Sequence, residues 1–160
     1  FGLLTTATAL GGILGTAIYA RLERAVSLAT IMRVGLVIET LTHLILAVTS
    51  SAAVALVVMV VFGTHASAWG TTASAVRQRA VPTELQGRVS SVYMISVFAG
   101  MVVGGLSGGV IARQWEILAP FWFGFVGSAL ILAVIWRTLD DIAHAPSADD
   151  GEAGSAGSAD

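Results

Sequence analysis

Long runs without a charged residue alternate along this chain with short segments that carry arginine. A membrane-spanning helix needs about 20 predominantly apolar residues, and in hydrocarbon the backbone amides must be satisfied within their own segment, which favours helices. The polar triplet Thr49-Ser50-Ser51 divides the longest run in two. The pattern therefore predicts an all-α membrane protein with five transmembrane helices, at about residues 1–20, 31–48, 52–76, 89–112 and 117–136.

The composition agrees with a membrane protein. Hydrophobic residues make up 56% of the 160 residues and charged residues 11%, whereas soluble domains carry about 25% charged residues. Cysteine is absent, which excludes disulfides and thiolate metal sites, and we expect neither a metal nor a cofactor. No basic patch suggests nucleic acid. Residues 144–160 are acidic and poor in large apolar side chains, so we expect a disordered cytoplasmic tail after a transmembrane domain at 1–143.

The arginines predict how the chain lies in the membrane, because positively charged loops stay on the cytoplasmic side. With five crossings, only Arg113 falls on the outer side. The arginines on the other side are Arg21, Arg24, Arg33, Arg77, Arg79, Arg88 and Arg137. This distribution predicts a cytoplasmic C-terminus, and the absence of lysine and asparagine indicates GC-rich bacterial coding, hence a bacterial inner membrane. Because the chain opens at Phe1 on the outer face, without a signal peptide, we expect it to be the C-terminal part of a longer polytopic protein.

Small residues recur at helical spacing on three of the predicted helices. They are Thr8, Gly11 and Gly15; Gly63, Ser67, Gly70 and Ser74; and Ser96, Gly100, Gly104 and Gly108. Because helices in lipid gain nothing by burying apolar side chains against each other, such seams mark close packing. We interpret Gly11, Gly15, Gly100, Gly104 and Gly108 as an interface on which a partner rocks, with plain tight packing as the alternative.

Three ionisable residues lie well inside the predicted spans: Glu39, His43 and His65. A charged group there costs at least about 2.5–3.5 kcal/mol on insertion scales, so it suggests a functional site. Glu39 and His43 share a helix face at i, i+4 and form either a proton-accepting pair or a tie to a neighbouring helix. His65 shares a face with Trp69 and Thr72, where it either lines a polar cavity or is satisfied by a neighbouring carbonyl.

The connector at residues 77–89 is the most distinctive stretch. Pro82 ends the preceding helix, and Thr83 is expected to cap the next one, with Gln86 completing a capping box and Glu84 in the positive first turn. Its three arginines, which either pair with acids elsewhere or only fix the topology, are Arg77, Arg79 and Arg88.

The connector also carries a resemblance. Its pattern Arg-Gln-x-x-Val-Pro-x-x-Leu-Gln-Gly-Arg-Val, which includes Gly87, is followed by a glycine-rich helix. It resembles the loop between helices 10 and 11 of the major facilitator superfamily, nearest to the bacterial enterobactin-exporter-like and macrolide-efflux-like transporters. Residues 11–24 resemble the repeated loop motif after helix 8, with Tyr19 where the motif has an acid. On this resemblance the five helices are helices 8–12, most of the C-terminal half of the superfamily fold.

The resemblance implies proton-driven export of a small amphipathic molecule, a drug or a siderophore, by alternating access of two six-helix halves. The implied partners are the lipid bilayer, the missing N-terminal half, the substrate and protons. It also implies that helices 8 and 11 face the other half and that helix 10 lines the cavity. That favours His65, Trp69 and Thr72 as the substrate or proton path over Glu39 and His43 on the peripheral helix 9.

Two other functional classes fit parts of the sequence. A non-transporting membrane scaffold or assembly subunit would explain the glycine seams without any cavity. The segment Gly105-Leu106-Ser107-Gly108 matches the Gly-x-Ser-Gly of rhomboid-type intramembrane proteases. That chemistry needs a histidine base on a later membrane helix, and no later predicted span contains one, so we expect no enzymatic activity.

Overall fold

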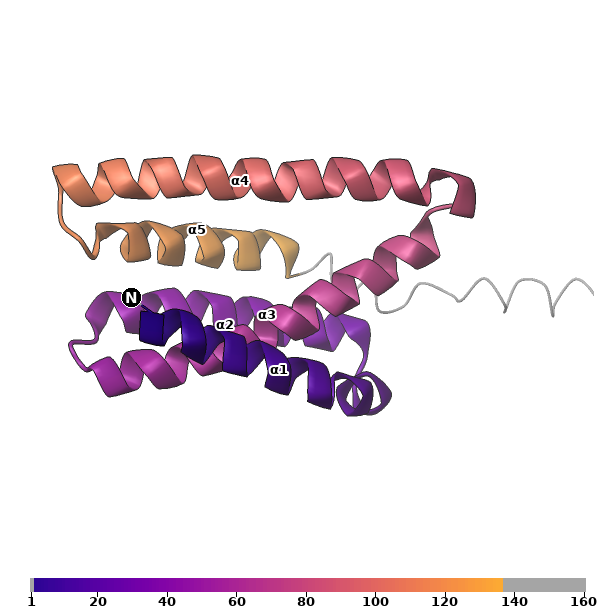
Figure 1. The fold of residues 1–160 in the computed structure, drawn as a ribbon, viewed down its shortest axis with the longest axis horizontal. Coiled ribbons are helices and arrows are strands. Elements are labelled where there is room, and N and C mark those ends of the chain that lie inside the picture. The colour runs from indigo at the N-terminus through magenta and orange to yellow at the C-terminus, as the bar shows by residue number, and fades with distance from the viewer. Residues whose placement is uncertain (1, 137–160) are drawn as a thin grey trace, which may run out of the picture.

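A computed structural model describes residues 2–136, apart from the side chain of Leu28, and within that range every regular element is helical (Figure 1). The prediction of an all-α fold is confirmed. The predicted tail at 144–160 and Arg137 lie outside the described residues. The helices are α1 (Gly2–Ala25), α2 (Leu28–Val48), α3 (Ala52–Ala80), the short 3-10 helix η1 (Thr83–Leu85), α4 (Gln86–Gln114) and α5 (Ala119–Ile135).

Four of these helices are long and apolar enough to cross a membrane, namely α1, α2, α3 and the α4 segment together with η1. At 1.5 Å per residue, the 29 residues of α4 span about 43 Å, well over the roughly 30 Å hydrocarbon core. The shorter α5 has 17 residues, which is about the lower limit for a crossing. The chain is thus a multi-pass membrane protein in which α5 is the shortest of five apolar helices.

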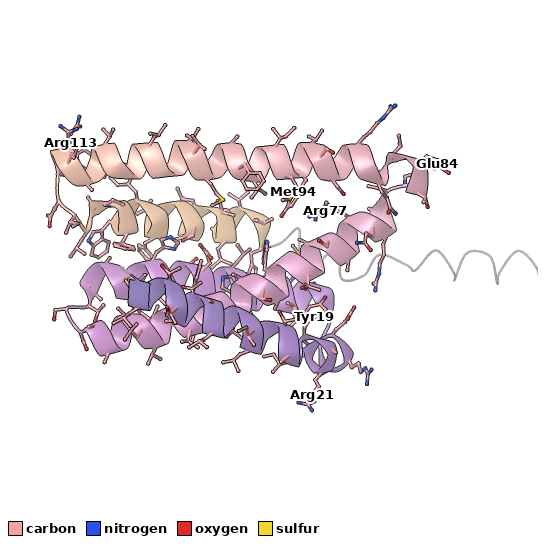
Figure 2. All side chains as sticks on the ribbon, in the orientation of Figure 1. Tyr19, Arg21, Arg77, Glu84, Met94 and Arg113 are labelled. Atoms are coloured by element: carbon pink, nitrogen blue, oxygen red, sulfur yellow. The ribbon has the colours of Figure 1, made fainter. Side chains whose placement is uncertain are left out.

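The helices lie in layers, with α1, α2 and α3 forming one group, α5 beside it and α4 outermost (Figure 1). The most extensive contact joins α1 to α3, followed by the contacts of α2 with α5 and with α3. The last turns of α3 leave the group at an angle and lead through η1 into α4. Arg21 and Arg77 lie toward one end of the helix bundle, and Arg113 lies at the other end (Figure 2).

Glycines allow the backbones of α1 and α3 to touch. A Cβ on Gly11 would clash with the Val60 carbonyl oxygen, and one on Gly63 would clash with the Thr8 carbonyl oxygen. A Cβ on Gly15 would likewise overlap the Thr64 carbonyl. This corrects the expectation that Gly11 and Gly15 face another half of the protein, because α3 already occupies their surface.

The glycines of α4 are in the opposite situation. None of the α4 residues is buried in the described part of the chain. A Cβ on Gly100 or Gly104 would meet nothing within 4 Å, and one on Gly108 would reach only the Pro120 Cβ at 4.0 Å. The two glycine seams therefore differ: α3 fills the one on α1, and the one on α4 is open.

The helix ends agree with the sequence at one place and correct it at another. The polar break at residues 49–51 separates α2 from α3, and Ser51 Oγ accepts the Val54 N–H at 3.5 Å. The capping box predicted for Thr83 and Gln86 is wrong, since Thr83 opens a 3-10 turn without a side-chain cap. The Gln86 amide instead donates to the carbonyls of Gln78, at 3.2 Å, and Val81, at 3.3 Å. The Gln86 side chain therefore points toward the end of α3 and does not cap α4, which begins at Gln86 itself.

Candidate proton and substrate site

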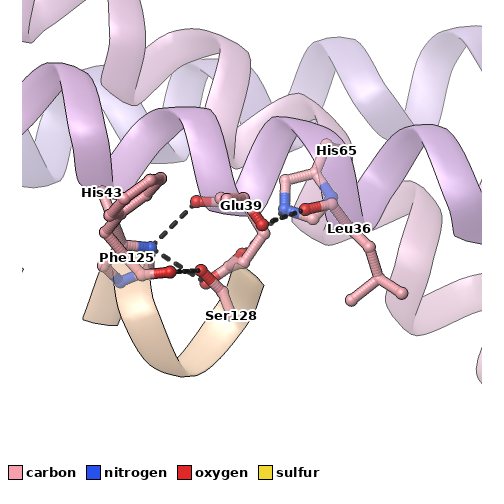
Figure 3. A network of polar contacts seen from close by, with 7 residues as sticks. Leu36, Glu39, His43, His65, Phe125 and Ser128 are labelled. Carbon is pink, nitrogen blue, oxygen red and sulfur yellow. Dashed lines mark hydrogen bonds and ion pairs between the residues drawn. The ribbon is translucent and has the colours of Figure 1, made fainter. Parts of the chain in front are cut away.

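The three ionisable residues predicted inside the spans come together between α2 and α3. His65 Nε2 lies 3.0 Å from Glu39 Oε2 (Figure 3). A carboxylate only accepts hydrogen bonds, so the Nε2–H of His65 donates to it. The His65 side chain is 8% exposed and that of Glu39 32%, so the imidazole is held inside while the carboxylate remains accessible.

His43 lies on the other side of the same carboxylate. Its Nδ1–H donates to the backbone carbonyl of Glu39 at 2.9 Å, and Nδ1 is 3.8 Å from Glu39 Oε1 (Figure 3). The sequence left Glu39 with His43 and His65 as rival sites on different helices. The structure joins the three into one cluster, with Glu39 between the two imidazoles. The signal for this was present, because one carboxylate and two imidazoles in apolar spans are each costly alone.

Glycines on the neighbouring helices make room for both imidazole rings. A Cβ on Gly124 of α5 would clash with the His43 ring. A Cβ on Gly35 of α2 would approach His65 Nδ1 and Trp69 Cε3, each at 3.1 Å. Neither Gly124 nor Gly35 stands out in the sequence as part of a site. Their part depends on which side chain the opposite helix presents, which periodicity along one helix does not show.

The second ring nitrogen of His65 is buried and has no hydrogen-bond partner among residues 2–136. The ring makes an edge contact with Phe62, with 5.6 Å between ring centroids. Only a nitrogen without a proton fits such a site without leaving a buried donor unsatisfied. The contacts therefore favour the arrangement of the ring in which Nε2 carries the hydrogen that faces Glu39 and Nδ1 carries none.

Two hollows reach the Glu39 carboxylate. One, of about 250 Å³, is lined by Leu36, Glu39, His65, Ala66 and Trp69. The other, of about 590 Å³, lies between α1, α2, α3 and α5, and Glu39 and His43 are its only titratable lining residues. Its walls are mostly apolar and include Met59, Phe62 and Phe121. Few polar groups in apolar walls are typical of sites for small organic molecules.

Thr72 does not belong to this site, contrary to the sequence interpretation that put it with His65 and Trp69. It is completely buried, and its hydroxyl lies 3.3 Å from the Tyr19 hydroxyl of α1. Thr16 and Ser67 make a similar contact between α1 and α3, with 2.9 Å between hydroxyl oxygens. Thr72 lies about two turns along α3 from His65 and on nearly the same side, but at that level of the helix its hydroxyl meets Tyr19 of α1. Of the three predicted residues, His65 and Trp69 share a hollow and Thr72 joins the two helices.

The connector arginines make two separate contacts. Arg79 Nη2 lies 3.8 Å from Glu23 Oε1 of α1, an exposed ion pair. The Arg77 guanidinium carbon lies 3.7 Å from the centroid of the Tyr93 ring of α4. Arg77 and Arg79 thus tie the end of α3 to different neighbours. The remaining residues of the predicted motif, which are solvent-facing, are Pro82, Glu84, Gly87 and Arg88.

The arrangement offers no constellation for metal or serine chemistry in the part of the chain that the structure describes. No group of three His, Asp or Glu side chains there is placed to hold a metal ion. The Ser107 hydroxyl donates to the Val103 and Gly104 carbonyls of its own helix, at 2.7 and 3.2 Å. Both described histidines lie in the Glu39 cluster instead. What the site presents is a carboxylate bridging two imidazoles beside apolar hollows.

Comparison with known proteins agrees with a transport role. The sequence model of the family described as transmembrane secretion effector matches residues 1–151. No curated protein and no solved structure matched the chain. Membrane transporters of this superfamily are generally not enzymes. With five apolar helices, and with a family match over nearly its whole length, the chain belongs to the transmembrane secretion effector family of major facilitator-type transporters.

Proposed function

We propose that this chain is part of a bacterial inner-membrane transporter that exports a small amphipathic molecule in exchange for protons, with Glu39 and His65 as the proton-carrying pair. The observation that carries the proposal is the 3.0 Å contact between Glu39 Oε2 and His65 Nε2, beside hollows whose other lining residues, apart from His43, are hydroxyl-bearing or apolar. An ionisable pair inside membrane-spanning helices costs free energy, and its presence there therefore suggests a function.

The surroundings of His65 supply a way to couple a proton to movement. A second proton on this imidazole goes to Nδ1, where the new N–H would be buried without an acceptor among the described residues. An unsatisfied buried donor costs about 1–3 kcal/mol. Protonation therefore favours a conformation in which α3 has shifted relative to α2 and Nδ1 has gained a partner. A change of this kind is what alternating access requires.

Few titratable groups face the Glu39–His65 pair. From α2 itself, His43 is the second titratable group beside Glu39. From α1, the hydroxyls of Thr5 and Thr8 line the larger hollow, and α5 presents Gly124 to His43. No other charged side chain lines the two hollows that Glu39 reaches. A substrate in either hollow would thus meet one carboxylate, whose charge depends on where the proton lies.

The open glycine face of α4 supports a further part of the proposal. In lipid, a helix face with glycine at every fourth residue favours close approach of another helix, and this one has no partner within the described residues. We propose that the other half of the transporter packs there and that the two halves rock. The arginine distribution and the positive-inside rule further lead us to propose that the loop at Thr83 and the C-terminus are cytoplasmic.

The test uses the full-length transporter in proteoliposomes with an imposed proton gradient and a panel of amphipathic dyes that includes ethidium. We expect Glu39→Gln to lose gradient-driven transport while dye still equilibrates down its own gradient. His65→Gln keeps a side-chain N–H for Glu39 but does not titrate, so it is expected to fold and to lose the pH dependence of transport. Glu23→Gln, which removes an exposed carboxylate at the end of α1, is the matched control and should transport like the parent.

Two outcomes would count against the proposal. Retention of gradient-driven transport by both Glu39→Gln and His65→Gln would mean that the pair is structural. A parent protein that moves none of the dyes, and that copurifies stoichiometrically with another membrane protein, would favour the scaffold or assembly subunit.

A further inference from the structure

A small polar hollow lies at the elbow where α3 passes into α4. It has a volume of about 60 Å³. Its polar lining comes from the end of α3 and the start of α4, and consists of Ser74, Arg77, Gln78, Gln86 and Ser90. Arg77 is visible between the two helices in Figure 2. The hollow is separate from the Glu39 cluster and plays no part in the proton argument.

Arg77 is held in this hollow by two contacts, and among residues 2–136 only one of its N–H groups donates a hydrogen bond. Its guanidinium lies over the Tyr93 ring, with 3.7 Å between Cζ and the ring centroid, and Nη2 donates to Ser74 Oγ at 2.9 Å. Stacking engages the flat face of a guanidinium, and its five N–H groups point outward in the plane. The ring thus orients the group while leaving in-plane donors for an acceptor.

The other walls of the hollow are suited to an anion. No carboxylate lines it: Glu23 of α1 lies 3.8 Å from Arg79, and Glu84 of η1 is exposed. The Gln86 amide donates to the Gln78 and Val81 carbonyls, and these hydrogen bonds hold this part of the lining in place. The Ser90 hydroxyl has no hydrogen-bond partner within residues 2–136. The lining thus offers one oriented cation and one hydroxyl without a partner among the described residues, and it contains no acid.

The size of the hollow narrows the class of ligand. A water needs about 10–15 Å³ of such space, so 60 Å³ holds about four to six waters, which is comparable to the five non-hydrogen atoms of a phosphate group. Arginine binds phosphate oxygens through parallel N–H bonds. Basic pockets between membrane helices on the cytoplasmic side are suited to anionic lipid headgroups.

We propose that the hollow formed by Ser74, Arg77 and Ser90 binds a phosphate group, with Arg77 as its counter-charge. The same chemistry is supplied by an anionic lipid headgroup or by free phosphate. Bound phosphate would join the end of α3 to the start of α4 and hold the elbow in this geometry. The phosphate contact itself is independent of the transported molecule, and only the lipid source depends on the elbow lying at the cytoplasmic surface.

The experiment measures the thermal unfolding midpoint of the purified full-length transporter in detergent. One arm titrates phosphatidylglycerol against phosphatidylcholine, and the other titrates sodium phosphate against sodium chloride at equal ionic strength. We expect phosphatidylglycerol to raise the midpoint of the parent. Arg77→Gln should bind it about tenfold more weakly, the effect of losing about 1.4 kcal/mol. Arg88→Gln, the same change of charge in the first turn of α4 but outside the hollow, is the control and should respond like the parent.

Each result decides the question. A response to sodium phosphate as strong as that to the lipid, and lost in Arg77→Gln, assigns the site to free phosphate. No response of the parent in either arm, or equal responses of Arg77→Gln and Arg88→Gln, overturns the proposal. Should Arg77→Gln fail to fold, Ser90→Asp leaves the Arg77–Tyr93 contact in place and adds a negative charge to the hollow. Undiminished lipid binding by Ser90→Asp would also overturn it.

Discussion

At the scale of single residues, what a glycine does is decided by what lies opposite. Gly124 and Gly127 are both on α5, three residues apart. A Cβ on Gly124 would clash with the His43 ring, whereas one on Gly127 would meet nothing within 4 Å. Gly124 therefore belongs to the candidate site, because it permits the ring to lie beside Glu39.

This contrast predicts opposite signs for the same substitution. Gly124→Ala should lower the free energy of unfolding by about 1–3 kcal/mol, the usual cost of overpacking, and should displace His43. Gly127→Ala fills open space in a helix interior and should raise it by roughly 0.5–1 kcal/mol. Unfolding in mixed detergent micelles, followed by circular dichroism, measures both. Equal effects of the two variants would show that His43 does not lie against Gly124.

The candidate site could be predicted from the sequence only in part. The sequence identifies Glu39, His43 and His65 as the ionisable residues deep in the spans, because little else there is charged. It does not bring them together, since that needs the rotation of α2 relative to α3. Thr72 shows the same limitation. Helical periodicity places it on the side of His65, but because α1 packs on α3, its hydroxyl contacts that of Tyr19.

At the scale of elements, the two glycine seams predict different phenotypes. Gly63→Ala places a Cβ on the Thr8 carbonyl, and because backbone cannot yield as a side chain can, we expect a loss of at least about 2 kcal/mol of stability or failure to insert. Gly104→Ala should have no such cost. Protein yield and unfolding in detergent provide the comparison, and a stable Gly63→Ala protein would contradict the close α1–α3 contact.

A bulkier change on α4 tests its role in transport. Gly104→Leu adds a side chain where the described structure has open space, so expression and insertion should match the parent. If another helix must approach this face, dye transport in proteoliposomes should be abolished. Undiminished transport by Gly104→Leu would show that the face meets only lipid. Gly2→Leu, at another helical glycine with open surroundings, controls for the added side chain.

The elements themselves were largely predictable because their signals are local. Charge-free runs identify the helices, and Thr49-Ser50-Ser51 identifies the break between α2 and α3. The start of α2 at Leu28 rather than near residue 31 reflects the Ser27 hydroxyl, which accepts the Thr30 N–H at 3.2 Å. The capping box at Thr83 failed because Gln86 found better acceptors at the end of α3.

At the scale of the whole molecule, the fold sorts the arginines to the two ends of the helix bundle. Arg21 and Arg77 lie toward one end and Arg113 at the other (Figure 2). Arg33 joins the end of α5, with its guanidinium carbon 5.4 Å from the centroid of the Trp136 ring. The positive-inside rule then predicts that the end bearing Arg21, Arg33 and Arg77 is cytoplasmic.

This orientation can be tested with single cysteines, because the chain contains none of its own. Thr83 opens the turn between α3 and α4, and Ser51 caps α3 at its opposite end. Thr83→Cys should react with a membrane-impermeant maleimide only after the cells are opened, whereas Ser51→Cys should react in intact cells. Both side chains are exposed, so slow labelling would reflect sidedness. Labelling of Thr83→Cys alone in intact cells would reverse the assignment. The phosphate site at Arg77 would then face the outer leaflet, and its lipid source would have to be sought there.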